Sequence, residues 1–224
     1  ALAVAPSLRD RIQIVTKCGI KAVSPARPEH SVKSYDSSRV HVLASVDNSL
    51  RCLRTDHIDL LLMHRHDMLM EPDALADTFR TLRTAGKVLH FGVSNHTPSQ
   101  FAMLHRRFPL VTNQFEFSPL HMGALDDGTL EQATDLRLPP MIWSPLAGGR
   151  LLRAGDDATR RVRGVLEDLG RAHSASAATM AYAWLRRHPS RPIPITGTGR
   201  VEGLREALAS ISIQLSAEDW YRIW

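Results

Sequence analysis

Short apolar runs alternate with longer stretches of helical periodicity along the whole chain. The runs are rich in β-branched residues and lie between segments with helix signals, which is the pattern of strands separated by helices. Such alternation is typical of βα units built around a parallel sheet. Six strands are predicted, at residues 12–16, 58–63, 90–93, 110–113, 140–143 and 193–196.

Apolar side chains recur at helical spacing between these runs. Thr97 followed by Pro98 predicts a capped helix start, and Gly86 is expected at the C′ position after a helix. No Pro-, Gly- or Ser-rich linker separates any two elements, so residues 1–224 are expected to form a single domain. Helices are predicted at residues 38–53, 72–84, 98–106, 128–136, 160–172, 175–188 and 201–210.

This order of elements favours a (β/α) barrel, and a doubly wound open sheet is the alternative. No G-x-G-x-x-G sequence follows the first predicted strand, which disfavours a Rossmann domain. A complete barrel has eight strands in about 250 residues, whereas six strands are predicted here. We therefore expect an α/β fold, a (β/α)8 TIM barrel with about the first two βα units absent from this chain.

The composition, with 43% hydrophobic and 23% charged residues among 224, is that of an ordinary folded domain. Two cysteines are too few for a disulfide framework, so a cytoplasmic location is expected. The longest apolar run is far shorter than the roughly 20 residues that span a bilayer, and no membrane partner is expected. The net charge of +5 comes from scattered arginines, so no nucleic-acid partner is expected either. The oligomeric state is left open.

Each predicted strand delivers polar or aromatic groups at its end. In a barrel the chemistry lies at the C-terminal ends of the strands, so these residues are the candidate active site. They are Lys17, His64, Ser94 with Asn95, Gln114, Trp143 with Ser144, and the Gly-Thr-Gly-Arg turn that follows residue 196.

Most of these residues also have a purely structural interpretation. Lys17 could be an ordinary surface lysine, although a charge buried at a strand end needs a partner carboxylate or a reaction. His64 could be a core histidine, and His64 with His66 would need a third ligand to bind a metal. The amides at the strand ends could satisfy loop backbone, and Trp143 could belong to the core.

The turn from Gly197 to Arg200 is the most suggestive local motif. Its two glycines let backbone N–H groups approach an anion, and the helix predicted from Val201 offers its positive end. The guanidinium of Arg200 can form paired hydrogen bonds with a phosphate. A phosphate site is therefore predicted after the last strand, where barrels commonly have one.

Several blocks of the sequence resemble the aldo-keto reductases in order and spacing over essentially the whole chain. The blocks are IVTKCG, TDHIDLLLMHRHD, GKVLHFGVSNHTPSQF, TNQFEFSPL, IWSPLAGGRL and AYAWLRRHPSRPIPITGTGR. The resemblance implies a (β/α)8 barrel that binds NADPH without a Rossmann domain. It also implies reduction of a small aldehyde or ketone to an alcohol by hydride transfer from the nicotinamide, with a catalytic tetrad of Asp, Tyr, Lys and His.

Two members of that tetrad have matching positions in this chain. Lys17 matches the tetrad lysine and His64 the tetrad histidine. The Asp and the Tyr, which is the general acid, lie in the family on an upstream segment that the 224 residues do not contain. None of Tyr35, Tyr182 and Tyr221 lies in the matching context. The resemblance therefore implies that the N-terminal segment is missing.

The resemblance also implies a set of cofactor contacts. Ser94, Asn95 and Gln114 match the residues that contact the nicotinamide carboxamide, and Trp143 matches the ring that stacks on the nicotinamide. Ser144, Pro145, Leu146 and Gly148 match the loop around the pyrophosphate. Gly197, Thr198, Gly199 and Arg200 match the turn that holds the 2′-phosphoribose, and Glu206 matches the adenine contact. Two positions depart from the family pattern: Gly203 replaces a frequent polar or basic contact, and Ala207 replaces a usual Asn. The preference for NADPH over NADH is therefore left open.

Two other functions compatible with these residues are kept as alternatives. One is a catalytically silent NADPH-binding regulatory or structural protein on the same barrel, since the cofactor residues are present without a proton donor. The other is a barrel lyase that forms a Schiff base with Lys17.

Overall fold

The computed structural model describes residues 2, 4–153 and 155–224. The chain divides into two compact units, Ala1–Asn113 and Gln114–Trp224, here called unit 1 and unit 2. The units are described one at a time. The single domain expected over residues 1–224 stays a prediction.

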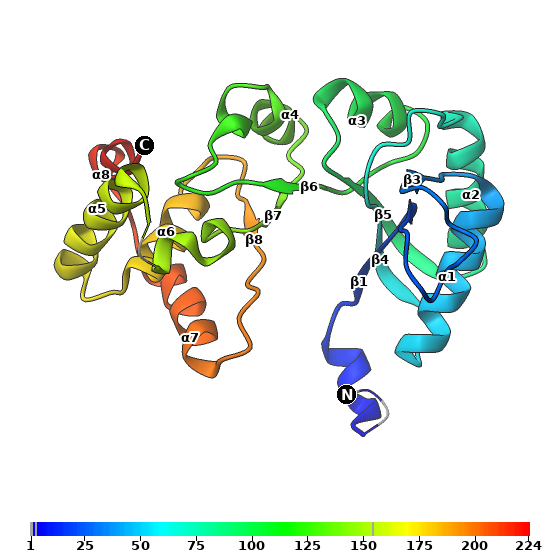
Figure 1. The fold of residues 1–224 in the computed structure, drawn as a ribbon, viewed down its shortest axis with the longest axis horizontal. Coiled ribbons are helices and arrows are strands. Elements are labelled where there is room, and N and C mark those ends of the chain that lie inside the picture. The colour runs from blue at the N-terminus through cyan, green and yellow to red at the C-terminus, as the bar shows by residue number, and fades with distance from the viewer. Residues whose placement is uncertain (1, 3, 154) are drawn as a thin grey trace. The chain divides into compact units, whose positions relative to one another are not determined.

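Unit 1 contains three parallel strands of the main sheet, with helices along one side of them (Figure 1). Its strands β1 (Val15–Cys18), β4 (Ile58–Met63) and β5 (Val88–Ser94) pair in that order. The helices are α1 (Arg39–Leu53), α2 (Pro72–Thr84) and α3 (Pro98–His105), and a 3-10 turn η1 (Pro6–Arg11) precedes β1. A small antiparallel pair, β2 (Ile20–Lys21) with β3 (Ser34–Tyr35), leads from the end of β1 toward α1.

Side-chain alternation gives this sheet two different faces. Phe91 of β5 stacks on Phe79 of α2 with ring centroids 4.4 Å apart, so this face carries the helices. On the other face Lys17 lies opposite Leu62, and Leu62 lies opposite Gly92. His64 lies two positions after Leu62, and Ser94 lies two positions after Gly92. Because side chains alternate between the faces, these two functional candidates belong to the second face.

Gly92 is required at its place in β5 by close packing. A Cβ there would lie 2.7 Å from the backbone oxygen of Thr112 and 2.8 Å from Cδ2 of Leu62. Both distances are shorter than van der Waals contact. Glycine at this position therefore allows the backbone of Thr112 and the side chain of Leu62 to pack directly against β5.

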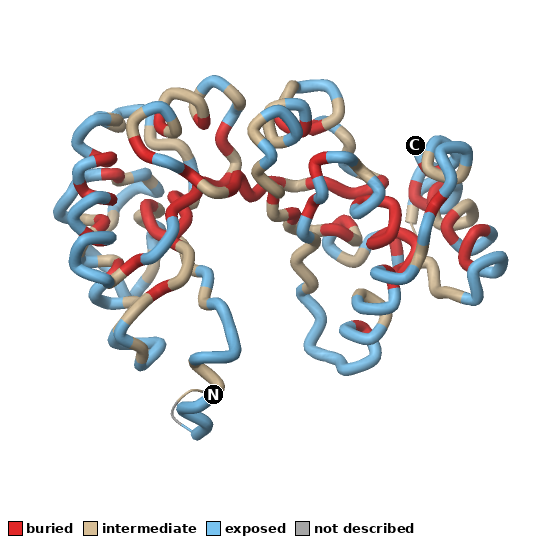
Figure 2. The backbone as a smooth tube through the Cα atoms, turned by 180° about the vertical axis from the view of Figure 1, so that it is seen from behind, coloured by how far each residue is buried: buried red, intermediate tan, exposed pale blue. Residues whose placement is uncertain are grey.

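Unit 2 contains the parallel strands β6 (Asn113–Glu116), β7 (Met141–Trp143) and β8 (Ile193–Pro194), with β6 starting at the last residue of unit 1. Its core packs around the buried Trp184, whose ring lies 5.1 Å from those of Phe117 and Trp220. In Figure 2 the buried stretches follow the strands and the inner turns of the helices. The helices are α4 (Thr129–Asp135), α5 (Asp157–His173), α6 (Ala177–Arg186), α7 (Val201–Ala209) and α8 (Ala217–Ile223), with 3-10 turns η2 (Gly123–Leu125), η3 (Ala147–Leu152) and η4 (Ser210–Ser212).

The structure confirms every predicted helix, and it shifts two of the predicted strands. The Thr97 capping box and the left-handed Gly86 are both present. The first strand, predicted at 12–16, begins only at Val15, because the N–H of Ile14 bonds to the carboxylate of Asp59. The fourth, predicted at 110–113, begins at Asn113. The sequence analysis did not predict α8, η1, β2 or β3. The eight-stranded barrel stays a prediction.

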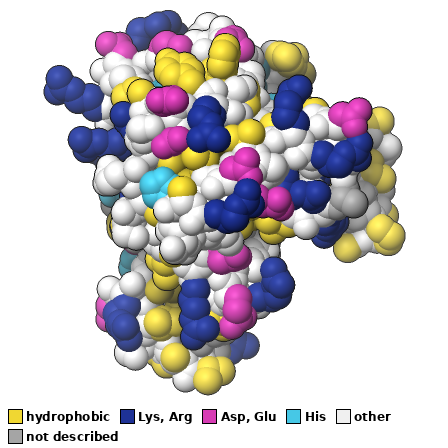
Figure 3. All heavy atoms as spheres, turned by 90° about the vertical axis from the view of Figure 1, so that its left-hand side faces the viewer, with side chains coloured by type: hydrophobic (Ala, Val, Ile, Leu, Met, Phe, Trp, Pro, Cys, Tyr) yellow, Lys and Arg dark blue, Asp and Glu magenta, His cyan; other side chains and the backbone are white. Residues whose placement is uncertain are grey.

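No helix in the described residues is long and apolar enough to cross a membrane. On the face drawn in Figure 3, basic and acidic side chains are interspersed without a continuous basic patch. Within the described residues some charges pair along one helix, such as Arg163 with Glu167. Pairs of this kind are typical of a solvated helix surface.

Two glycines of helix α5 should respond to alanine in opposite directions. A Cβ on Gly170 would lie 2.5 Å from the backbone oxygen of Ala175, whereas a Cβ on Gly164 meets nothing within 4 Å. We expect Gly170→Ala to lower the free energy of unfolding by about 1–3 kcal/mol. The matched control Gly164→Ala should raise it by up to about 1 kcal/mol. Denaturant unfolding of both variants checks this, and equal effects would contradict the packing account.

Candidate functional site

The second face of the unit 1 sheet brings a cation beside a histidine. Lys17 is half-buried, one residue before the end of β1, and burial lowers the pKa of its ammonium group. Burial and the positive charge of Lys17 lower the pKa of His64. Within the described residues no carboxylate lies within ion-pair distance of Lys17. The structure thus places a lysine without an acidic partner next to a neutral histidine.

A tight turn follows β5 and holds the next two candidates. Asn95 has a left-handed backbone with φ of 56°, and its side-chain amide donates to Oγ of Ser94 at 2.7 Å. His96, which the sequence analysis did not select, is 3% exposed and hydrogen-bonds through Nδ1 to the backbone oxygen of Ser94 at 3.0 Å. The side-chain amide of Asn113 donates to the backbone oxygen of His96 at 2.8 Å. These bonds fix the turn that presents Ser94 and Asn95.

His96 is buried in its neutral form. Burial lowers its pKa to about 4. Because the backbone oxygen of Ser94 can only accept, Nδ1 carries the proton, and the buried Nε2 is left without a hydrogen-bond partner. The ring of His66 lies edge-on at 5.3 Å. In the part of the chain that the structure describes, no group of three His, Cys, Asp or Glu side chains could hold a metal.

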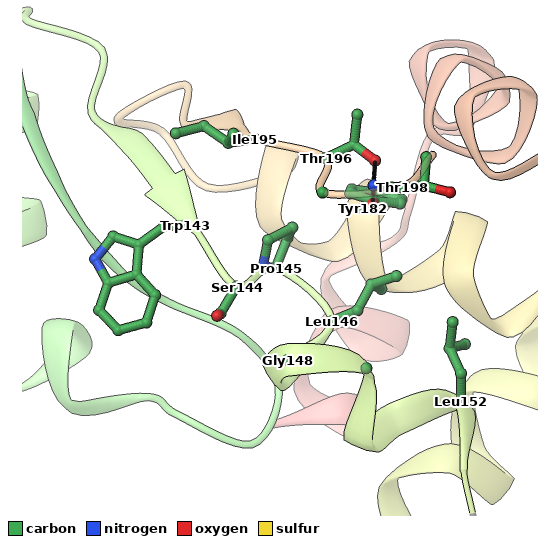
Figure 4. A pocket seen from close by; sticks show the side chains of 12 residues that line it. Trp143, Ser144, Pro145, Leu146, Gly148, Leu152, Tyr182, Ile195, Thr196 and Thr198 are labelled. Carbon is green, nitrogen blue, oxygen red and sulfur yellow. Dashed lines mark hydrogen bonds between the residues drawn. The ribbon is translucent and has the colours of Figure 1, made fainter. Parts of the chain in front are cut away.

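Unit 2 carries a cavity of about 520 Å³ at the ends of β7 and β8 (Figure 4). A volume of this size is typical of a small-molecule site. Seven predicted cofactor residues line it: Trp143, Ser144, Pro145, Leu146, Gly148, Gly197 and Thr198. The other lining residues were not predicted, and they are Gly149, Leu152, Tyr182, Ile195 and Thr196.

Four predicted residues of unit 2 do not line this cavity. Gln114 is buried in β6, where its amide contacts Sδ of Met141 at 3.8 Å. Glu206 is half-buried in α7, and its backbone oxygen accepts from Thr179 at 3.1 Å. Gly199 and Arg200 are exposed in the loop before α7. The structure therefore groups the stacking residue, the pyrophosphate candidates and two of the four phosphoribose candidates, and leaves Gln114, Gly199, Arg200 and Glu206 outside that group.

The turn after β7 is unusual in its backbone. Ser144 and Ala147 both have φ of 52°, and Gly148 and Gly149 follow with φ of 64° and 86°. Left-handed conformations are unfavourable for residues with a Cβ and persist where surrounding structure enforces them. Asn95 after β5 has the same conformation, so strained residues directly follow two of the strands that carry candidates.

The loop from Thr196 to Arg200 leads directly into α7, as the sequence predicted. The N–H of Thr198 donates to Oγ1 of Thr196 at 3.4 Å, and the N–H of Arg200 donates to Oγ1 of Thr198 at 3.2 Å. Arg200 is the N-cap residue, and no side chain caps the first turn of α7. The exposed N–H groups at this helix start are suited to an anion.

Comparison with known proteins supplies a family. The sequence profile described as "Aldo/keto reductase family" matches residues 1–224. The chain is 46% identical over 227 residues to the oxidoreductase YcsN of Bacillus subtilis (strain 168), covering 100% of this chain and 76% of that protein. It is 38% identical over 225 residues to a 6-dehydroglucose reductase of Agrobacterium fabrum (strain C58), covering 100% of this chain and 75% of the reductase.

A solved structure agrees with the sequence matches. The crystal structure of a thermostable aldo-keto reductase in complex with the inhibitor epalrestat superposes with a TM-score of 0.80 at 25% identity. The match covers 96% of this chain and 71% of that structure. It supports an α/β fold with a parallel sheet. The family match begins at residue 1, so it lends no support to the expectation of missing N-terminal βα units.

His96 should make the stability depend on pH. Above pH 6.5 the ring is neutral in both states, whereas below it the unfolded chain takes up a proton that the folded chain refuses down to about pH 4. The free energy of unfolding should therefore fall by up to about 3 kcal/mol as the pH drops across this window. Denaturant unfolding at several pH values checks this. His96→Gln should flatten the pH slope and the exposed His90→Gln should not; equal slopes in all three proteins would refute the assignment.

Proposed function

The chain belongs to the aldo/keto reductase family, and we propose that it is an NADPH-dependent enzyme that reduces an aldehyde or a ketone to an alcohol. Two relatives are named as an oxidoreductase and a reductase, which supports an oxidoreductase function for this chain. The observation that carries the proposal is the cavity of unit 2, which brings Trp143, the strained turn after it and the loop before α7 to one place.

The residues of this cavity and of the loop beside it, up to Arg200, fit a phosphorylated dinucleotide. Trp143 offers a flat ring on which a nicotinamide can stack. The N–H groups at the start of α7 and the guanidinium of Arg200 are suited to a phosphate. When bound, the nicotinamide supplies the hydride. We propose that the turn from Ser144 to Gly148 contacts the pyrophosphate and that Ser94, Asn95 and Gln114 hold the carboxamide.

Lys17 and His64 are proposed to act at the carbonyl oxygen, where negative charge develops during reduction. The neutral His64 can donate a hydrogen bond to that oxygen. The positive charge of Lys17 would lower the pKa of the phenol that donates the proton. The resemblance implies a tyrosine for this step, which we expect in a segment upstream of Lys17 that the 224 residues do not include.

Lys17→Met should separate chemistry from cofactor binding. We expect carbonyl-dependent NADPH oxidation by the full-length gene product to fall by about 10²- to 10⁴-fold, because the proton donor loses its activating cation. The affinity for NADPH, followed by quenching of tryptophan fluorescence, should stay nearly unchanged. Simple aldehydes and a 6-dehydro sugar are suitable substrates, since one relative is a 6-dehydroglucose reductase.

The possible outcomes of this experiment separate the alternatives. Equal loss of binding and turnover in Lys17→Met would make the lysine a structural group. If the unmodified protein bound NADPH without turnover of any carbonyl, the catalytically silent binding protein would replace the reductase. If it bound no NADPH, the cofactor assignment would be wrong.

Arg200 should set the preference for a phosphorylated cofactor. Its guanidinium is exposed and makes no ion pair within the described residues, whereas Arg205 on the same helix pairs with Glu202 at 3.3 Å. We expect Arg200→Ala to raise KM for NADPH by about 10- to 100-fold, the loss of a charged hydrogen bond, and to leave KM for NADH unchanged. Arg205→Ala is the matched control. Similar effects of the two substitutions would argue against a phosphate contact at Arg200.

A further inference from the structure

The loop Thr196–Arg200 is held from two helices by residues that have no assigned role. Tyr182 of α6 contacts the first residue of the loop, and Gly203 of α7 lies against its middle. From the sequence, Gly203 was noted only as a departure from the family pattern, and Tyr182 only as a tyrosine outside the context of the catalytic tyrosine. Their contacts indicate that this loop takes its shape before any ligand binds.

Tyr182 anchors the start of the loop by one hydroxyl. The residue is 4% exposed, and its OH donates to Oγ1 of Thr196 at 3.3 Å (Figure 4). The same Oγ1 accepts the N–H of Thr198. A buried phenol needs a partner, and here the partner is the side chain that also turns the loop backbone. The ring of Tyr182 forms part of the cavity wall.

Gly203 allows the middle of the loop to pack against α7, because it has no side chain. A Cβ on Gly203 would lie 2.5 Å from Oγ1 of Thr198 and 3.0 Å from its Cβ and Cγ2. Thr198 therefore occupies the space that any other residue at position 203 would fill. In that position its Oγ1 accepts the N–H of Arg200, the N-cap residue of α7.

These contacts divide the N–H groups of the loop into two sets. Those of Thr198 and Arg200 bond to the threonine hydroxyls. Those of Gly197 and Gly199 have no hydrogen-bond partner in the described part of the chain, and both glycines are exposed. The loop thus keeps its own shape while leaving two N–H groups free to bind a ligand.

We propose that Tyr182 and Gly203 are positioning residues that preform the Thr196–Arg200 loop for the 2′-phosphate of NADPH. The inference rests on the proposed function. A loop that is ordered in advance loses less conformational freedom when it binds, so preforming it strengthens binding without touching the reacting atoms. Loosening the loop should therefore raise KM for NADPH and leave kcat unchanged.

The test of Tyr182 removes one oxygen atom. Tyr182→Phe and the control Tyr221→Phe, whose tyrosine is 65% exposed on α8, are titrated in the full-length product with 2′,5′-ADP and with 5′-AMP. We expect Tyr182→Phe to weaken 2′,5′-ADP binding by about 2- to 10-fold, the range for one neutral hydrogen bond. Binding of 5′-AMP and kcat should not change. Thr196→Val, which also removes the acceptor of the Thr198 N–H, should weaken binding at least as much, and the double variant should bind no more weakly than Thr196→Val alone.

The test of Gly203 distinguishes an effect on loop shape from an effect on helix stability. Alanine favours helix more than glycine does, so Gly203→Ala should not melt α7, but its methyl group must displace Thr198. We expect weaker binding of 2′,5′-ADP with an unchanged helical circular dichroism signal. In a Thr198→Gly background, where the clash is absent, Gly203→Ala should have no further effect.

The outcomes distinguish this inference from the function on which it rests. If the unmodified protein binds neither NADPH nor 2′,5′-ADP, both the proposed function and the inference fail. If it binds both but Tyr182→Phe behaves like Tyr221→Phe, or weakens 5′-AMP and 2′,5′-ADP equally, only the inference fails. A fall in kcat for Tyr182→Phe with unchanged KM would also overturn it.

Discussion

The parallel register of β1, β4 and β5 is the constraint on which the unit 1 candidates depend. Because Lys17 lies opposite Leu62 and Leu62 opposite Gly92, the period of two places Lys17, His64 and Ser94 on one face. A slip of one residue would turn all three toward the helices. The apolar packing on the other face, led by Phe91 against α2, holds the register. Apolar residues on the opposite face therefore determine which side chains lie on the polar face.

In unit 2 the corresponding constraint is backbone conformation rather than register. The turn after β7 has left-handed residues at Ser144 and from Ala147 to Gly149, and the loop before α7 needs a glycine at position 203 for Thr198 to pack. Both segments adjoin the same cavity. Strands β7 and β8 are short, so the cavity is lined mainly by the turns that follow them. Hydrogen bonds and close packing fix the geometry of these turns.

The sequence predicted what depends on local pattern and missed what depends on contacts between distant segments. Every α-helix except α8 followed from periodicity and capping, and Lys17 and His64 followed from strand ends. The start of β1 was misplaced because Asp59, 45 positions away, takes the N–H of Ile14. Tyr182 bonds to Thr196, 14 positions away, and the backbone oxygen of His96 accepts from Asn113, 17 positions away. Neither Tyr182 nor His96 carries a distinctive local signal. Only three-dimensional coordinates bring such partners together.

Some energetically unfavourable features of this chain lie at or beside the residues for which chemistry is proposed. A half-buried lysine without a carboxylate and a buried imidazole nitrogen without a partner both destabilise the fold, and left-handed Asn95 and Ser144 add backbone strain. A role in structure alone would favour an ion pair at Lys17 and glycine at the strained turns. Left-handed residues with a Cβ also occur away from the candidates, at Arg54, Arg137, Ser174 and Arg191. The half-buried charge of Lys17 is therefore the feature that a ligand explains best.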